Sequence, residues 1–217
     1  TYLPDYPKEN GDKITIHHLL THTSGIPNYT RAPNFFKDKA RNPYAPEEFV
    51  NTFCNLPLEF APGEKFKYSN SGYFLLGYII EKVSGKTYED YLQEVILTPL
   101  QMKNTGYDHS QTVLKNRASG YDKKGKNIKN TLYIDMSIPY AAGSLYSTVE
   151  DLFLWDQAFY SNKLLSAKAT ESLFAPHIKA WGGFYGYGWA TREVAKENDS
   201  KLALIEHGGS INGFHSN

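Results

Sequence analysis

The sequence has a single cysteine, no net charge and no long hydrophobic run, and each of these absences excludes a class of protein. Cys54 is the only cysteine among 217 residues, so no disulfide can form within the chain. Lysine plus arginine and aspartate plus glutamate each number 23, so charge provides no argument for binding nucleic acid or an anionic membrane. The longest apolar stretch is far below the roughly 20 residues that cross a bilayer.

The remaining composition is that of a globular protein. Hydrophobic residues make up 41% and charged residues 21% of a chain long enough for one large domain or two small ones. A single cysteine leaves the cellular compartment open, because exported proteins can also lack disulfides. No signal peptide opens the chain, and we expect the sequence to begin inside a mature protein.

A turn followed by an apolar helix organises the first half of the chain. Pro62 and Gly63 predict a turn, because proline fixes φ and glycine accepts positive φ. Residues 73–83 are apolar on nearly every face, which indicates a helix packed on several sides. Gly85 follows this helix at the position where a left-handed residue is favoured, and so predicts its end.

The tripeptide Tyr68-Ser69-Asn70 lies between that turn and that helix. Ser69 or Asn70 can cap the start of the helix. The side chains of Tyr68 and Asn70 are then held on a rigid turn in front of this buried helix, as catalytic side chains need to be. The simpler interpretation is a helix cap preceded by a packed aromatic ring.

The rest of the chain predicts mainly helices up to residue 178 and strands after it. Helices are expected over 16–22 after Thr15, from Pro46 through Phe53, over 88–97 after the capping pair Thr87 and Asp90, after the capping box Ser147 to Glu150, and after Ser166. Strands are expected over 181–189 and 201–206, with a hairpin tip at 123–126. Residues 1–11 and 28–44 show no clean period and predict loops, the second of them a binding surface.

His18 and His22 are four residues apart, which is metal-ligand spacing if both lie on one helical face. The glutamate of the HExxH pattern is absent, and no third ligand lies nearby in the sequence, so capping and packing are the favoured roles. Cys54 is expected to pack as a small hydrophobe, because no neighbouring feature would lower its pKa.

Several short motifs occur in order along nearly the whole chain. They are Leu19–Gly25 (LLTHTSG), Pro62-Gly63, Tyr68-Ser69-Asn70, Ala142–Ser147 (AGSLYS) with Glu150-Asp151-Leu152, Gly186–Trp189 (GYGW) and His207-Gly208-Gly209. Together they resemble the serine β-lactamase and penicillin-binding-protein family, most closely its class C β-lactamase-like branch, which includes D-amino peptidases and esterases.

The resemblance implies an α/β (α+β) fold in which helices flank an antiparallel sheet beside a mainly helical region. Residues 1–217 would form part of one catalytic domain, with 1–178 as the mainly helical region and 179–217 supplying strands. The family sheet has five strands, of which we expect two or three in this chain.

The resemblance also implies the roles of particular residues. It assigns catalysis to Tyr68 and His207 and substrate binding to Asn70, Gly208, Gly209 and Ser210. Tyrosine is a poor base at its ordinary pKa of about 10, so neighbouring cations must stabilise the phenolate or relay its proton. The two glycines would leave a strand edge open to a substrate, and the Ser210 N–H would be an oxyanion donor. The alternative for His207 is a strand-end histidine in a solvated turn.

The nucleophile motif of the family, Ser-x-x-Lys, is missing. No serine in the sequence has lysine three residues later, and Thr112 with Lys115 lies in the wrong part of the order. We therefore expect the chain to be a piece that begins after this motif and is inactive alone.

Three functions follow as alternatives. The first is a serine acyl hydrolase that acts through an acyl-enzyme on a β-lactam, a D-alanyl peptide or an ester. The second is a binding-only relative that has lost the nucleophile, and the third is a metal hydrolase that uses His18, His22 and one further histidine. No cofactor and no nucleic-acid partner are expected, the oligomeric state stays open, and the resemblance implies an extracytoplasmic location.

Overall fold

The computed structural model describes residues 2–195 and 200–217; residue 1 of the expected loop 1–11 and residues 196–199 lie outside the described residues. The helical segments are α1 (Lys8–Gly11), α2 (Ile16–Leu20), η1 (Tyr29–Arg31), α3 (Phe35–Asp38), α4 (Pro46–Val50), α5 (Asn70–Ser84), α6 (Tyr88–Leu92), η2 (Gln93–Leu97), α7 (Thr98–Leu100), η3 (Tyr140–Ala142), α8 (Val149–Ala158) and α9 (Ala167–Phe174). The strands are β1 (Gly106–Tyr107), β2 (Tyr121–Lys124), β3 (Asn127–Asn130), β4 (Leu145–Tyr146), β5 (Ile178–Ala180), β6 (Gly183–Tyr185), β7 (Ala190–Ala195), β8 (Lys201–Glu206), β9 (Gly209–Ile211) and β10 (Phe214–Ser216).

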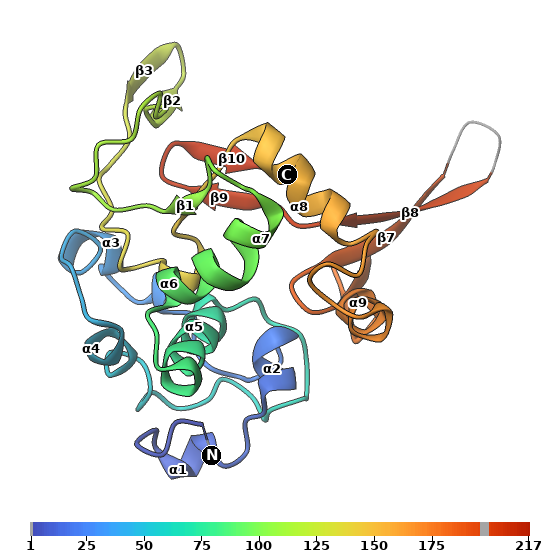
Figure 1. The fold of residues 1–217 in the computed structure, drawn as a ribbon. Coiled ribbons are helices and arrows are strands. Elements are labelled where there is room, and N and C mark those ends of the chain that lie inside the picture. The colour runs from blue at the N-terminus through green and yellow to red at the C-terminus, as the bar shows by residue number, and fades with distance from the viewer. Residues whose placement is uncertain (1, 196–199) are drawn as a thin grey trace.

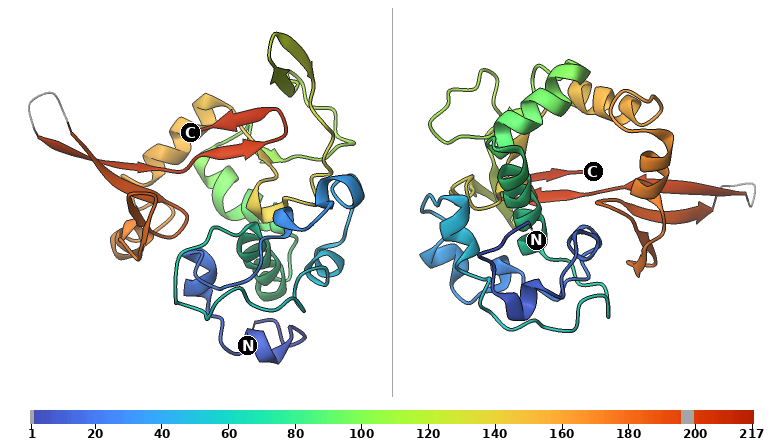
Figure 2. Two further views of the ribbon diagram at one scale, coloured as in Figure 1. Left: turned by 180° about the vertical axis from the view of Figure 1, so that it is seen from behind. Right: turned by 60° about the horizontal axis from the view of Figure 1, so that its bottom comes forward.

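The fold is mixed α/β, with helices dominating the first part of the chain and strands the last. Figure 1 shows α1, α2 and α4 around α5 in the lower half of the molecule, with the N-terminus beside α1, and the long ribbon of β7 and β8 extending away from them. Both views in Figure 2 show the same ribbon projecting from the body of the molecule, with the C-terminus beside β9 and β10. In the part of the chain that the structure describes, no helix is long and apolar enough to cross a membrane.

The main sheet is an antiparallel meander of four strands in the order β5-β6-β7-β8, where two or three strands were expected. The expected strand over 201–206 is confirmed as β8, but the single strand expected over 181–189 was wrong. Trp181 and Gly182 both have positive φ, 48° and 80°, and form the turn between β5 and β6. A turn of this handedness reverses the chain within two residues, so only Gly183–Tyr185 of that stretch pairs as β6.

Local capping signals were largely confirmed. The hydroxyls of Thr15, Thr87 and Ser166 each accept a backbone N–H at the start of α2, α6 and α9. The capping box expected at Ser147 was wrong by one residue, because Thr148 caps α8 by accepting the Asp151 N–H at 3.3 Å. The Ser147 hydroxyl instead forms a hydrogen bond with Thr105 at 2.7 Å.

Several helix boundaries differ from the expected ones, and one expected hairpin turn is confirmed. Helix α2 stops at Leu20 instead of 22, α4 stops at Val50 instead of Phe53, and α1 falls inside the expected loop 1–11. The helix expected over 88–97 continues as α6, η2 and α7 to Leu100, three residues beyond its expected end, and Pro99 lies within α7. The hairpin tip at 123–126 is confirmed by the pairing of β2 with β3 around Gly125, whose φ is 63°.

Helix α5 lies at the centre of an aromatic core. Phe74 of α5 is fully buried and packs against Phe49, with their ring centroids 4.8 Å apart. Tyr29 and Phe35 join the same cluster, so the stretch 28–44, expected as a loop, contains two helical turns, η1 and α3, that each bury an aromatic ring, while most of its other residues are exposed. Single helical turns such as η1 and α3 are too short to show a period, although they can bury an aromatic side chain.

Cys54 is part of the same core, as expected. Its thiol is buried, and this burial raises its pKa above the ordinary value, which disfavours the nucleophilic thiolate.

Gly77 of α5 provides a test of this packing. A Cβ at this position would lie 2.3 Å from the Ala141 Cβ and 2.8 Å from the Tyr140 Cε1. We expect Gly77→Ala to lower the free energy of unfolding by about 1–3 kcal/mol through overpacking. Helix propensity alone predicts the opposite sign, a gain of about 1 kcal/mol.

Urea unfolding followed by circular dichroism measures the difference. Val83→Ala on the same helix is the matched control, because Val83 is 65% exposed, and it should change stability by less than about 0.5 kcal/mol. A midpoint for Gly77→Ala equal to or above that of the parent protein would contradict the contact.

Candidate functional site

Tyr68 and His207, the two residues expected to be catalytic, lie beside each other. Tyr68 directly precedes the N-cap of α5, and His207 directly follows β8. Their ring centroids are 6.2 Å apart, and both side chains are half-buried. The structure therefore brings together two residues that are separated by more than half of the chain.

His22 and Tyr185 complete this group, and the sequence did not assign either residue to the site. The His22 ring lies 4.1 Å from the Tyr68 ring, and the Tyr185 ring lies 5.2 Å from the His22 ring. The Tyr185 hydroxyl is within hydrogen-bond distance of two histidine nitrogens, Nε2 of His22 at 3.2 Å and Nε2 of His207 at 3.1 Å. A fully buried tyrosine thus joins a loop after α2 to the end of β8.

The signals that could have found these residues are weak. His22 belongs to the motif Leu19–Gly25 that carried the resemblance, and Tyr185 belongs to the glycine-interleaved aromatic run 181–189. Neither motif reveals which residues the side chains of His22 and Tyr185 contact, because those contacts depend on long-range packing.

Burial keeps the imidazoles of the site neutral. It lowers the pKa of His22 to about 3, with a further contribution from the nearby His207. Burial also lowers the pKa of His207, although a backbone hydrogen bond at Gly208 opposes this. At neutral pH both histidines therefore act as hydrogen-bonding groups and not as cations.

Burial acts on the tyrosines in the opposite sense. It raises the pKa of Tyr68 above its ordinary value, and it raises the pKa of Tyr185 with added contributions from Tyr73 and Tyr68. Both phenols are therefore protonated at neutral pH. Of the lysines close to Tyr68 in the sequence, Lys67 pairs with Glu59 at 2.6 Å. The described surroundings of Tyr68 thus contain no cation that lowers its pKa.

The metal-site interpretation of His18 and His22 finds no support in the described residues. Helix α2 ends before His22, whose φ is 55°, so the two histidines are not on one helical face. Nδ1 of His22 accepts the Ser69 N–H at 3.2 Å, and Nδ1 of His18 accepts the Thr15 N–H at 3.3 Å. No group of three His, Cys, Asp or Glu side chains that could hold a metal occurs among the residues described.

The motif His207-Gly208-Gly209, the third in the family order after Ser-x-x-Lys and the second motif, Tyr68-Ser69-Asn70, is shaped by its neighbouring strand. Ser210 of β9 pairs with His215 of β10, and Gly209 pairs with Ser216. A Cβ on Gly209 would lie 2.5 Å from the Ser216 Oγ, so a larger residue there would require the exposed Ser216 side chain to rotate. A Cβ on Gly208 would meet nothing closer than 3.6 Å. The substrate-binding roles of Gly208, Gly209 and Ser210 stay predictions.

Asn70 and the serines near it can be placed individually. Asn70 is the first residue of α5 and is half-buried, and its contact with a substrate stays a prediction. The Ser69 hydroxyl occupies the N-cap but makes no capping bond, and it is buried without a partner among the described groups. The Ser71 hydroxyl donates to the Pro27 carbonyl at 2.7 Å and accepts the Tyr29 N–H, so it is structural.

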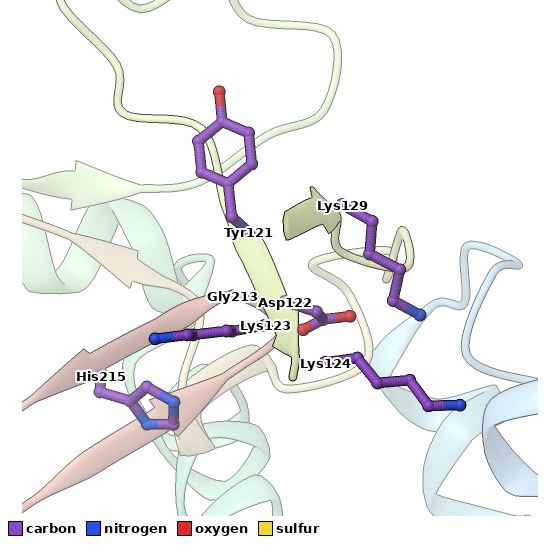
Figure 3. Close-up of a pocket in the computed structure, with 7 residues that line it drawn as sticks. All are labelled: Tyr121, Asp122, Lys123, Lys124, Lys129, Gly213 and His215. Carbon is purple, nitrogen blue, oxygen red and sulfur yellow. The ribbon is translucent and has the colours of Figure 1, made fainter. Parts of the chain in front are cut away.

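A hollow of about 630 Å³ lies over the hairpin of β2 and β3. Figure 3 shows that its lysines do not converge, since Lys124 and Lys129 extend to one side while Lys123 extends towards His215. Asp122 lies between them and offsets part of their charge. The hollow therefore lacks the focused positive charge of an anion site.

The fold resembles that of a penicillin-binding protein from Bacillus halodurans, whose solved structure superposes with a TM-score of 0.71 at 26% identity over 93% of this chain and 72% of that one. The family model described as Beta-lactamase matches residues 1–217, and the chain belongs to this family.

Comparison with individual proteins agrees with this assignment. The chain is 33% identical to PbpX of Bacillus subtilis over 189 residues, which cover 87% of this chain and 45% of PbpX. It is 31% identical to another penicillin-binding protein of the same organism over 98% of this chain and 49% of that protein. Among solved structures, a D-stereospecific amidohydrolase from Streptomyces superposes with a TM-score of 0.81 at 26% identity, over 94% of this chain and 63% of that one. The chain thus spans about half the length of these curated relatives.

The lowered histidine pKa values predict how stability depends on pH. Unfolded His22 has a pKa of about 6.5, so below that pH the unfolded chain takes up a proton that the folded chain does not. The free energy of unfolding should therefore fall with decreasing pH, by on the order of 1 kcal/mol per pH unit from His22 between about pH 6 and pH 4.

Urea unfolding of the parent protein and of His22→Gln across this range measures the slope. The substitution should remove most of the part due to His22, and an identical slope in both proteins would contradict the assignment. An NMR titration of His22 in the parent protein gives an independent measurement, because the folded imidazole should stay neutral at pH 5.

Proposed function

We propose that the complete protein is a serine acyl hydrolase that forms an acyl-enzyme intermediate. The observation that carries the proposal is the meeting of Tyr68, from the second family motif, with His207, from the third, at a ring separation of 6.2 Å. The family assignment and the amidohydrolase neighbour support hydrolysis as the reaction class.

In the proposed mechanism, a serine supplied by the Ser-x-x-Lys motif attacks the acyl carbonyl of the substrate. Tyr68 takes the proton of that serine and passes it to the leaving group, so that an ester to the serine forms as the scissile bond breaks. Water then attacks this ester, and the serine recovers its proton through Tyr68. Asn70 hydrogen-bonds the substrate amide, and the Ser210 N–H stabilises the oxyanion.

Because the pKa of Tyr68 is raised, the proposed mechanism requires a cation beside Tyr68. A buried, protonated phenol cannot take a proton at neutral pH unless a cation stabilises its phenolate or relays the proton. The lysine of Ser-x-x-Lys supplies that cation in the proposed mechanism. Residues 1–217 contain no such motif, so this chain alone is proposed to be inactive.

The proposed substrate is a small molecule or peptide with an acyl group, namely a β-lactam, a D-alanyl peptide or an ester. The amidohydrolase neighbour is named as D-stereospecific, which supports an amide of a D-residue among these three. An extracytoplasmic location is proposed with it, because D-alanyl peptides are components of the bacterial cell wall.

Covalent labelling tests the proposed function directly. The full-length gene product and residues 1–217 are each incubated with a fluorescent penicillin and with a fluorescent activated ester. We expect the full-length protein to be labelled on a serine outside the sequence given and the shorter chain to stay unlabelled.

Labelling of a serine within residues 1–217 would show that the nucleophile is misplaced. Reversible binding of penicillin to the full-length protein without any adduct would instead support a binding-only relative. Either result would reject the mechanism proposed above.

Tyr68→Phe is expected to lower the turnover of the full-length protein by roughly 10²-fold or more, because it removes the proton-transfer group and retains the ring. Asn70→Ala should mainly raise KM, since its role is to position the substrate. Tyr160→Phe is the control, because Tyr160 is 80% exposed and should leave turnover unchanged. Near-normal turnover of Tyr68→Phe would remove Tyr68 from the mechanism.

The lowered pKa of His207 predicts an acid-side loss of activity. The imidazole is neutral at neutral pH, because burial holds its pKa below the ordinary histidine value of about 6.5. If the neutral form is required, kcat/KM should fall as the pH decreases below that value, and His207→Lys should abolish this acid limb. A decline above neutrality that responds to the same substitution would show that His207 acts as a cation.

A further inference from the structure

Trp181 offers a large apolar surface beside Tyr68. Its ring centroid lies 5.9 Å from that of Tyr68, 5.0 Å from that of Phe66 and 5.7 Å from that of Tyr185. The contacts with Phe66 and Tyr185 are edge-to-face, at interplanar angles of 82° and 87°. Even so, 62% of Trp181 is exposed, which leaves much of the indole open next to the proposed proton-transfer residue.

The turn that carries Trp181 does not explain why a tryptophan stands there. Trp181 and Gly182 join β5 to β6, and both have positive φ, 48° and 80°. Two-residue hairpin turns with positive φ at both positions favour asparagine, aspartate and glycine, and a bulky side chain at such a φ is strained. A smaller residue would therefore form the same turn with less strain. Backbone strain of this kind clusters at active and binding sites, where the side chain is needed at that place.

A smaller hollow, of about 260 Å³, lies over the main sheet beside Trp181. Trp181, Arg192 and Glu206 are among the residues that line it, and Glu206 directly precedes His207. The Arg192 guanidinium lies 2.9 Å from Oε1 of Glu206, so the two charges largely offset each other. A cavity of about 150 Å³ is enough to hold a benzene ring. The hollow therefore has room for an uncharged aromatic group.

We propose that Trp181 is a specificity-determining residue whose exposed indole packs against an aromatic ring of the substrate close to the scissile bond. An aromatic partner is favoured over an aliphatic one, because ring pairs gain free energy from their geometry beyond the area that they bury. An uncharged partner is favoured, because Tyr68 is protonated and the charge of Arg192 is offset by Glu206. The proposal rests on the proposed function, since it takes the acyl group to react beside Tyr68, and it narrows the substrates to esters and amides that carry an aromatic ring.

Binding of an aromatic ring can be measured without turnover. Protein from the full-length gene is labelled with ¹⁵N-tryptophan and titrated with phenylacetamide and, separately, with acetamide. The indole N–H signal of Trp181 is assigned with Trp181→Phe. We expect phenylacetamide to shift this signal in a saturable way and acetamide at the same concentrations to leave it in place. An unmoved Trp181 signal, or equal shifts with both amides, would overturn the proposal.

Kinetics supply the second measurement. Trp181→Asn removes the indole but keeps a residue that tolerates positive φ, so this variant is expected to fold. Its substrates are the methyl thioester of phenylacetic acid, the benzyl thioester of acetic acid and, without a ring, the methyl thioester of acetic acid. We expect kcat/KM to fall by roughly 10-fold for at least one ring-bearing thioester and by less than about 2-fold for the third, with Trp181→Phe retaining most of the preference. Equal losses with all three substrates would overturn the proposal.

Phe153→Ala is the matched control. Phe153 of α8 is also 62% exposed, and among the described residues it makes no ring contact with Tyr68 or Trp181, so its removal should leave all three rates unchanged. If the parent protein forms no adduct in the labelling experiment, the proposed function fails, and the NMR titration still decides whether Trp181 binds a ring. If the adduct forms but Trp181→Asn keeps the preference for ring-bearing substrates, the role of Trp181 fails alone.

Discussion

The arrangement of the site depends on one buried hydroxyl, that of Tyr185. A phenol removed from water must find hydrogen-bond partners, and Tyr185 finds them in His22 and His207, which come from opposite ends of the chain. Satisfying this group fixes the end of β8 against the loop after α2. The strand region is thereby held against the helical region. The Tyr68 ring lies beside them, with its centroid 4.1 Å from that of the His22 ring.

Helix α5 supplies the rigid part of this arrangement. It is buried along Phe74, Leu75 and Gly77, so its first turn cannot move without disturbing the aromatic core. The Ser69 N–H at its start is one of the donors that a helix leaves without an internal partner. This N–H donates to Nδ1 of His22. The start of α5 therefore holds Tyr68 in place and also keeps Nδ1 of His22 unprotonated.

Features that depend on neighbouring residues could be predicted from the sequence, whereas features that depend on distant contacts could not. Thr15, Thr87 and Ser166 cap helices as expected, because a cap needs only the next three residues. The pairing of Tyr68 with His207 followed from the resemblance to a family. Tyr185 was missed because a glycine-rich aromatic run does not reveal which hydroxyl is buried. His22 was considered as a metal ligand because a helix was extended two residues too far.

Because both imidazoles beside Tyr68 are neutral, the described residues do not by themselves make Tyr68 a base under the proposed function. Tyr68 is surrounded by the rings of His22, Trp181 and His207, and both imidazoles are held neutral by burial. Such surroundings shield a phenol from water but do not favour its phenolate, so they raise its pKa. Placing a single cation beside Tyr68 in this low-dielectric setting would have a large effect on that pKa. Under the proposed function, the described residues therefore prepare a protonated, oriented tyrosine, and the lysine of the Ser-x-x-Lys motif converts it into a base only where the nucleophile is also present.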